Sequence, residues 1–170
     1  TFGTMYAIHL KPEGASYTAT KEEFVARTPL PLTDVAIGRD GAMYFTIGGR
    51  GTQSELFRVT YKGDAPTVAV DPREKTGAEA RALRRKLESL HHGDAKNTAE
   101  ALKLIWPNLG NEDRAIRYAA RVALENLPVA SWRDKIAGES SVRAATSALI
   151  ALARQGDESD RPLVIKQLTG

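Results

Sequence analysis

The residues in this sequence best suited to chemistry are a glycine-rich run, a histidine pair and some scattered acids and hydroxyls. Residues 48–52 read Gly-Gly-Arg-Gly-Thr, and such a run could bring backbone N–H groups close to a phosphate, because glycine has no side chain to obstruct an anion. No Gly-Lys-Ser/Thr follows the run, and the downstream segment has a strand pattern, so a Walker site is not predicted. A tight loop between two strands is the favoured alternative.

The histidines could bind a metal ion, but their spacing favours structural roles. His91 and His92 are adjacent. Adjacent side chains on a helix point about 100° apart, so they rarely share one ion. A pair at a helix C-terminus is the alternative, because a protonated imidazole interacts favourably with the helix dipole. His9 shares a predicted strand face with Met5 and Ala7, which favours a half-buried structural role unless its side chain points into a pocket.

The acids, hydroxyls and basic residues form no recognisable catalytic set. Asp34 and Asp40 flank a predicted strand, and turn roles explain both better than a general acid and base would. Serines such as Ser54 have no recognisable base partner, so a nucleophilic triad is not predicted. The basic run at 81–86 predicts a solvated helix face rather than nucleic-acid contact, because the net charge is only +3. The sequence therefore predicts no catalytic residue and no metal site.

The elements that must position these residues differ between the two halves of the chain. Residues 1–75 hold eight of the eleven aromatics and eight of the fourteen glycines, whereas residues 76–170 hold seventeen alanines. Aromatic residues with frequent turns are typical of sheet, and alanine-rich segments are typical of helix. The sequence therefore predicts an α+β protein, with a small antiparallel sheet over 1–62, a linker over 63–76 and helices over 77–170.

Alternating patterns predict short strands in the first half. They are expected over 5–10, 16–20, 23–26, 33–38, 42–47 and 56–61. The clearest hairpin joins 33–38 to 42–47 through Arg39-Asp40-Gly41, because Asp-Gly supplies the positive φ that a tight turn needs. The dipeptide Asp71-Pro72 is typical of a linker.

Apolar stripes of helical period predict successive helices in the second half. They are expected over 77–91, 95–106, 112–126, 129–137, 140–155 and 158–168. Candidate N-caps are Asn111, Ser131 and Ser140, with Asp94 before another helix start. Candidate C-terminal stops are Gly93, Gly110 and Gly156.

The helical half contains an internal repeat. Segment 113–119 aligns with segment 139–145 at an offset of 26, which pairs Ile116 with Val142. Paired helices that stack on one another produce such a pattern, and the two aliphatic residues are predicted to face inward in equivalent layers.

The same alignment pairs Arg117 with Arg143, and both are predicted to form structural ion pairs inside the stack. Trp106 and Trp132 are predicted to pack in the core or between repeats, because an aromatic side chain buries a large area there.

Two parts of the chain resemble known families. Segments 113–124 and 142–152 resemble HEAT repeats, over roughly residues 77–169. Upstream, residues 32–46 read LTDVAIGRDGAMYFT, and with the glycine-rich run and the strand at 56–61 they resemble the last blade region of propellers related to soluble quinoprotein sugar dehydrogenases. The order of propeller end and HEAT repeats is similar to that of large exported bacterial proteins that finish with a heme-binding cytochrome c domain.

The resemblance implies a non-catalytic scaffold or interaction segment, which links a propeller dehydrogenase-like module to a heme module in an exported, periplasmic or secreted protein. Its implied partners are neighbouring domains or another copy of the chain. A blade cut from a propeller exposes faces and edges, which are expected to be covered by the helices, by a second copy or by residual disorder near Thr1. Pyrroloquinoline quinone, calcium and heme c are implied for the parent protein and none for this segment, which has no cysteine for a Cys-x-x-Cys-His motif.

The alternative is that the sheet contributes one wall of a sugar or quinone site that absent blades complete. Tyr44, Arg50 and His9 are then the candidate cofactor-binding residues, and Arg50 is best suited to an anionic group. The opening TFGTMYAIHL has no basic leader pattern, and no apolar run is long enough to predict a membrane span. A start at Thr1 inside a strand pattern suggests a piece of a longer protein.

Overall fold

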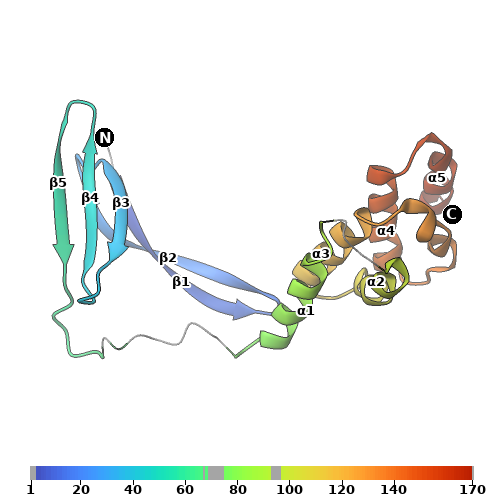
Figure 1. The fold of residues 1–170 in the computed structure, drawn as a ribbon, viewed down its shortest axis with the longest axis horizontal. Helices are drawn as coiled ribbons and strands as arrows, with labels where there is room; N and C mark the ends of the chain where they lie inside the picture. Colours follow the sequence, from blue (N-terminus) through green and yellow to red (C-terminus); the bar gives the residue numbers. More distant parts are fainter. Residues whose placement is uncertain (1–2, 67, 69–74, 93–96, 170) are drawn as a thin grey trace. The chain divides into compact units, whose positions relative to one another are not determined.

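The computed structural model describes residues 3–66, 68, 75–92 and 97–169 of the 170-residue chain. It is a mixed α/β structure with two small antiparallel sheets and a set of helices (Figure 1), which confirms the predicted combination of sheet and helix. The predicted linker dipeptide Asp71-Pro72, the stop Gly93 and the cap Asp94 lie outside the described residues.

The chain divides into two compact units. The first contains Thr1–Lys11 and Thr18–Arg73, and the second contains Pro12–Tyr17 and Glu74–Gly170. The sequence-based division was 1–62, 63–76 and 77–170. It places residues 12–17 with the strands, whereas in the structure they belong to the helical unit. That segment includes the turn of the first hairpin.

The strands form two sheets, where the sequence predicted one. Strands β1 (Gly3–Glu13) and β2 (Ser16–Arg27) form a two-stranded sheet. Strands β3 (Leu32–Ile37), β4 (Met43–Gly49) and β5 (Thr52–Val59) form a three-stranded antiparallel sheet with β4 at its centre. Strand β2 is also one continuous strand rather than the two predicted, because its polar central residues pair along a hairpin without needing a buried face.

Tight turns join the three strands of the second sheet, as the glycines predict. Ile37 pairs with Met43 across the first turn, in which Gly41 has a φ of 75°. Gly49 pairs with Thr52 across the second, which leaves only Arg50 and Gly51 as the connection. The glycine-rich run therefore forms a hairpin turn between two strands, which is the alternative that the sequence favoured over a phosphate-binding loop.

One face of the three-stranded sheet carries the small core of the first unit. Its buried residues are Leu30, Phe45 and Ile47, and the hydrophobic side chains packed against them are Met5, Val25, Leu32, Met43, Phe57 and Val59. The rings of Phe45 and Phe57 stack with centroids 4.8 Å apart. The cover therefore includes Met5 and Val25 from the β1–β2 hairpin, a source that the sequence did not indicate.

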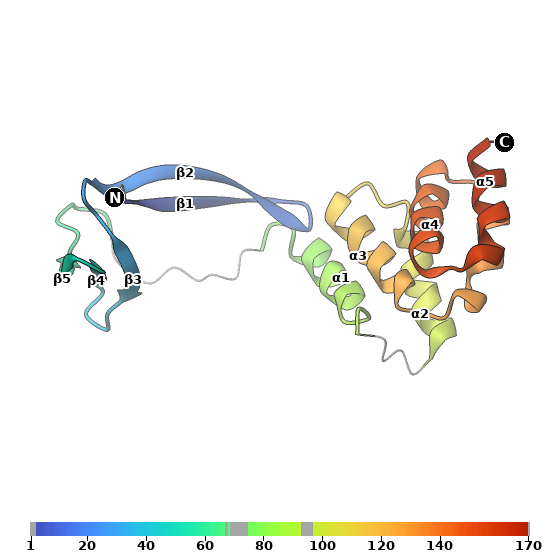
Figure 2. The ribbon, with the colours of Figure 1, turned by 90° about the horizontal axis from the view of Figure 1, so that it is seen from above.

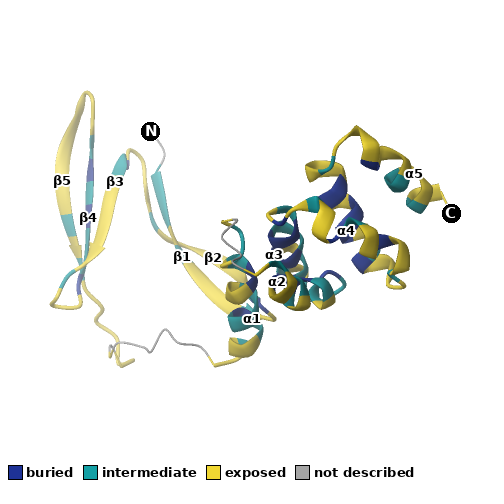
Figure 3. Ribbon diagram, turned by 45° about the vertical axis from the view of Figure 1, so that its right-hand side comes forward, coloured by how far each residue is buried: buried dark blue, intermediate teal, exposed yellow. Residues whose placement is uncertain are grey.

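This cover is incomplete at strand β3. The register places Val35 opposite Phe45 and Ile37 opposite Met43, so these four side chains share one face of the sheet. Yet Val35 is 50% exposed and Ile37 is 71% exposed. Buried positions concentrate on β4 in Figure 3, and the neighbouring strands are mostly exposed.

Five α-helices and four 3₁₀ turns are described in the second unit. The α-helices are α1 (Ala78–Glu88), α2 (Thr98–Ile105), α3 (Arg114–Glu125), α4 (Val142–Gln155) and α5 (Arg161–Thr169). The 3₁₀ turns are η1 (Trp106–Asn108), η2 (Val129–Ser131), η3 (Arg133–Gly138) and η4 (Glu158–Asp160). The predicted spans agree with these within a few residues.

The predicted helix at 129–137 is the exception, because η2 and η3 replace it with two short 3₁₀ turns. Pro128 precedes η2 with an extended ψ of 124°. Trp132 then interrupts the segment with a φ of −139° and turns its side chain into the core. Such interruptions leave stretches too short for an α-helix, and short stretches commonly adopt the 3₁₀ form.

The helix caps also differ from the sequence prediction. The N-caps of α3 and α4 are Asp113 and Ser141 rather than Asn111 and Ser140. Both have extended backbones from which a side-chain oxygen reaches N–H groups of the first turn. The Ser131 hydroxyl donates to a backbone carbonyl and caps no helix.

The corrected caps change the register of the internal repeat from 26 to 28 residues. Alignment of Asp113 with Ser141 superposes buried positions on buried positions along both helices. The pairs are Ile116 with Ala144, Ala119 with Ser147, Ala120 with Ala148, Ala123 with Ala151 and Leu124 with Leu152. Val142, which the sequence paired with Ile116, is 81% exposed. A two-residue slip turns a helix by about 200°, so the offset of 26 compared opposite faces.

Helices α1, α3 and α4 lie side by side, and α5 packs against α4 (Figure 2). Trp132 is 1% exposed in the core, and its indole N–H donates to the Leu127 carbonyl oxygen over 3.3 Å. Trp106 is half-buried against the same core, and its indole N–H donates to Glu139 Oε2 over 2.7 Å. Both tryptophans therefore pack as predicted.

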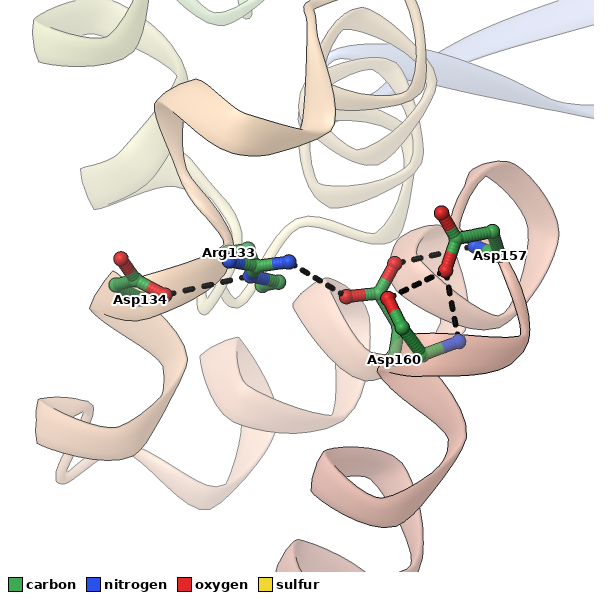
Figure 4. A network of polar contacts seen from close by, with 5 residues as sticks. Arg133, Asp134, Asp157 and Asp160 are labelled. Carbon is green, nitrogen blue, oxygen red and sulfur yellow. Dashed lines mark hydrogen bonds and ion pairs between the residues drawn. The ribbon is translucent and has the colours of Figure 1, made fainter.

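A polar network links η3 to η4, the 3₁₀ turn that leads into the last helix (Figure 4). Arg133 of η3 donates to the buried carboxylate of Asp160 over 3.2 Å and also contacts Asp134. Asp160 in turn accepts the backbone N–H of Asp157, the residue that caps η4. The hydrogen bonds that Arg133 donates to Asp160 and Asp134 raise the pKa of Arg133, so this guanidinium stays charged. None of the described helices is long and apolar enough to cross a membrane.

Candidate functional site

The structure uses Tyr44 in a polar cluster on the three-stranded sheet. The Tyr44 hydroxyl donates to Asp40 Oδ2 over 2.8 Å, and Arg58 donates to the same oxygen over 2.9 Å and to the Tyr44 hydroxyl over 3.0 Å. The hydrogen bonds from Arg58 and Tyr44 lower the pKa of Asp40 to about 2. Asp40 also accepts the Ala42 N–H, so the predicted turn role is confirmed and a second role is added to it.

The other two candidate cofactor residues do not join this cluster. Arg50 occupies the β4–β5 turn, at the opposite end of β4 from Tyr44, and six residues of extended strand span about 20 Å. His9 lies on β1 and its imidazole contacts Glu22 Oε2 over 2.9 Å. Its side chain is 60% exposed, so the half-buried role predicted for it is wrong. Tyr44, Arg50 and His9 therefore do not come together in one cluster.

The adjacent histidines have separate environments. His91 Nε2 donates to the Ala119 carbonyl oxygen of α3 over 2.9 Å, and His92 is exposed. Helix α1 ends at Glu88, so neither residue belongs to the helix. Within the described residues, no three His, Asp or Glu side chains are grouped so that they could hold a metal ion.

The best-formed site of the second unit is the place where the turn at 12–17 packs on the helices. Asp113 accepts the Ala15 N–H over 2.6 Å through Oδ2, and its Oδ1 accepts the first-turn N–H groups of Ala115 and Ile116. One carboxylate thus caps α3 and holds the turn, and Ala15 is fully buried. Burial opposes ionisation of Asp113, but these three backbone hydrogen bonds outweigh it, and its pKa lies below 3.8.

Two glycines permit this close packing. Gly14 has a φ of 53°, and a Cβ there would lie 2.1 Å from Asp113 Oδ2. Gly77 has a φ of 71°, and its Cβ would lie 2.4 Å from the Gly14 carbonyl oxygen. L residues rarely adopt such backbones, so both positions favour glycine on two grounds.

Part of the basic run on α1 supports the same turn. Arg81 is 6% exposed, donates to the Thr76 carbonyl oxygen over 2.7 Å and lies over the Tyr17 ring at 4.9 Å. The Arg84 side chain is 27% exposed and pairs with Glu88 over 3.1 Å. The prediction of a solvated basic face is therefore wrong for Arg81 and holds only for exposed members such as Arg85. The cation–π contact and the hydrogen bond to Thr76 both help to offset the cost of burying Arg81.

A cavity of about 710 Å³ adjoins the turn. Its charged and aromatic lining residues are Glu13, Tyr17, Arg84, Glu88, Glu112, Asp113, Arg114 and Tyr118. Carboxylates outnumber guanidiniums in this lining by four to two.

A second hollow of about 310 Å³ lies between the exposed faces of α3 and α4. We call it the arginine groove, and its lining residues are Arg114, Arg117, Tyr118, Arg121, Arg143, Thr146, Ser147 and Ile150. The spacing of three and four residues places the members on one side of each helix. The groove and the cavity share Arg114 and Tyr118, so they form one continuous surface across α3.

The sequence predicted that Arg117 and Arg143 form ion pairs inside the stack, and neither does: the pair of Arg143 lies at the exposed rim. Arg143 forms an ion pair with Glu112, whose side chain is 90% exposed. Arg117 instead donates to the Asn111 and Glu112 backbone carbonyl oxygens, which leave its charge uncompensated. The sequence did not single out Arg114, Tyr118 or Arg121, although their helical spacing was the available signal.

Comparison with known proteins gives this chain no relative, because no family model, curated protein or solved structure matches it.

Proposed function

We propose that this chain is a non-catalytic scaffold segment, and that its helical unit binds a protein through the face formed by α3 and α4. The observation that carries the proposal is the arginine groove, a hollow lined by side chains that two neighbouring helices present in the same direction. A groove of this kind offers charge and apolar contact but no nucleophile paired with a base.

The corrected register supports a HEAT-like arrangement of these helices. Two α-helices with the same burial pattern, 28 residues apart, pack side by side, and each is preceded by a shorter helical segment. Stacked helix pairs of this type form extended surfaces that bind proteins. The same register aligns Asn111 with Glu139, and the side chain of each accepts the N–H of the following N-cap residue, over 2.9 and 2.8 Å.

The wider context of the proposal comes from the family resemblance of the sequence. In that context the three-stranded sheet is the blade-like end of a propeller dehydrogenase-like module, and the helical unit joins it to a heme module of an exported protein. The exposed Val35 and Ile37 on the core-side face of the sheet support this view, because a neighbouring blade would cover them.

Site-specific photo-crosslinking in the organism that makes the protein tests the proposal. A photoreactive phenylalanine analogue replaces Tyr118, which is 60% exposed in the groove. We expect a discrete protein crosslink, identified by mass spectrometry, and binding of that purified protein to the chain in calorimetry.

The matched control places the same analogue at Lys103, an exposed residue of α2 that does not line the groove. A crosslink of equal yield at Lys103, or no protein crosslink at Tyr118, overturns the proposal. If the crosslinked partner binds equally well when Arg143 is changed to Glu, the groove is not the binding surface.

A further inference from the structure

We infer that the occupant of the arginine groove is an acidic peptide segment with aliphatic side chains, supplied by a partner protein. The inference rests on the proposed function and names the chemistry of the partner. It depends on the balance of charge in the groove and on the apolar residues beside that charge.

The groove holds more positive charge than its own carboxylates neutralise. Glu125 pairs with Arg121 and also with Arg154, over 3.0 Å to the latter, so one carboxylate serves two guanidiniums. Glu112 pairs with Arg143 at the rim. The remaining guanidiniums of the groove, Arg114 and Arg117, have no carboxylate partner in the described part of the chain. A ligand with carboxylates would complete this arrangement, because guanidinium groups bind carboxylates with two parallel hydrogen bonds.

Apolar side chains beside the arginines favour a peptide over a nucleic acid. Ile150 lines the groove and is 45% exposed, and Val142 at the start of α4 is 81% exposed. Aliphatic side chains of a peptide can bury this surface, whereas a phosphate backbone cannot. Tyr118, the one aromatic ring among the described residues of the groove, already lies under the Arg121 guanidinium at 5.1 Å, so it is less available to stack a base.

The charge of the neighbouring cavity limits where the peptide can bind. Among the described residues, the lining of the cavity has more carboxylates than guanidiniums, whereas that of the groove has four arginines and no acid. The two hollows share Arg114 and Tyr118. An acidic segment is therefore attracted by the arginines of the groove and repelled by the carboxylates of the cavity, which confines it to the groove.

Fluorescence anisotropy with defined probes tests the inference on the full chain. The main probe is a short labelled peptide in which glutamates flank two leucines, and its controls are the same peptide with lysines for glutamates and one with serines for leucines. We expect saturable binding of the main probe alone, weakening as salt is raised.

Variants then locate the site. Arg114→Glu and Arg143→Glu change exposed side chains that do not pack in the core, and each should weaken binding by about tenfold or more, the value of a charge-assisted hydrogen bond. The control Arg85→Glu makes the same charge change on an exposed residue of α1 outside the groove and should leave the affinity unchanged. Glu112→Gln releases Arg143 and should strengthen binding by about twofold to fivefold.

Three outcomes overturn the inference: no binding of the main probe, an equal loss in Arg85→Glu, or binding of a labelled single-stranded oligonucleotide that matches the peptide in affinity and in sensitivity to Arg114→Glu. The first of these outcomes, combined with a protein crosslink at Tyr118, would refute the acidic peptide alone and leave the scaffold proposal standing. If the main probe does not bind and Tyr118 gives no protein crosslink, the acidic-peptide inference and the scaffold proposal are both refuted.

Discussion

The helical unit and the sheet unit differ most in the size of their cores. Within the described residues, eighteen buried hydrophobic residues form one cluster in the helical unit, whereas three form the cluster of the sheet unit. Burial of apolar area is the main source of folding free energy, so the helical unit has far more of it to offset the loss of chain entropy. The sheet unit also leaves large apolar side chains exposed, such as Ile8, Ile37 and Leu56, and the proposed neighbouring module would cover some of them.

The β1–β2 hairpin contributes to both units, which is a second difference from a simple division of the chain. Its turn contributes Ala15 to the large helical core. Its two strands contribute Met5 and Val25 to the small core of the sheet unit. Sequence-based division at a linker assumes that each unit is a continuous segment. Here a six-residue turn belongs to the unit formed by residues far along the chain.

The largest expected effect concerns the helical core and the repeat register. Ile116→Ala removes a side chain that is 4% exposed and should lower the free energy of unfolding of the helical unit by about 2–5 kcal/mol, because it leaves a cavity. Val142→Ala should change it by less than about 0.5 kcal/mol, because Val142 is 81% exposed. Urea unfolding followed by circular dichroism measures both. Equal losses of stability in the two variants would contradict the 28-residue register and favour the offset of 26, in which Ile116 and Val142 are equivalent.

An intermediate effect is expected at the carboxylate that holds the hairpin turn. Asp113→Ala removes the α3 cap, which costs about 1–2 kcal/mol, and it leaves the buried Ala15 N–H without a partner, which adds to the loss. The pKa of Asp113 is lowered in the folded state. Its stabilisation is therefore complete above pH 3.8, the ordinary pKa of an aspartate side chain, and is lost as the pH falls through the lower pKa of the folded state.

Unfolding of the two proteins measured between neutral and acidic pH checks this prediction. The wild-type helical unit should lose stability on acidification more steeply than Asp113→Ala, and the difference between them should shrink. A constant difference down to the lowest pH at which both are folded would show that ionised Asp113 does not hold the turn.

The smallest effect on stability is expected in the polar cluster of the sheet unit. Arg58→Met removes the main hydrogen-bond donor to Asp40, so the pKa of that carboxyl should rise from about 2 toward 3.8, as measured by carbon-detected magnetic resonance titration. The cluster is exposed, so the midpoint of thermal unfolding at neutral pH should hardly change. Arg39→Met, on an exposed residue of the same turn, is the matched control and should leave the pKa of Asp40 where it is. A large drop in the unfolding midpoint would mean that this surface cluster, rather than the small core, stabilises the sheet.

The candidate site could be predicted from the sequence only in part. The Arg-Ala-Ile-Arg-Tyr-Ala-Ala-Arg segment of α3 shows arginines at helical spacing, which suffices to place them on one side of that helix. Their alignment with Arg143 and Ile150 depends on how α3 packs against α4, and the offset of 26 gave the wrong phase. The role of Asp113 was equally hidden, because its partner Ala15 lies 98 residues away in the chain.

The sequence by itself determined most of the local structure of this protein: which segments are strands and helices, apart from 129–137 and the continuity of β2, where the glycine turns lie, and that two tryptophans are packed. These features follow from periodicity and backbone preference, which act over a few residues. Tertiary structure alone decided the burial of Arg81, the phase of the repeat, the docking of a hairpin turn on α3 and the groove between α3 and α4. Each of these depends on contacts between residues distant in the chain, whose free energy no short segment contains.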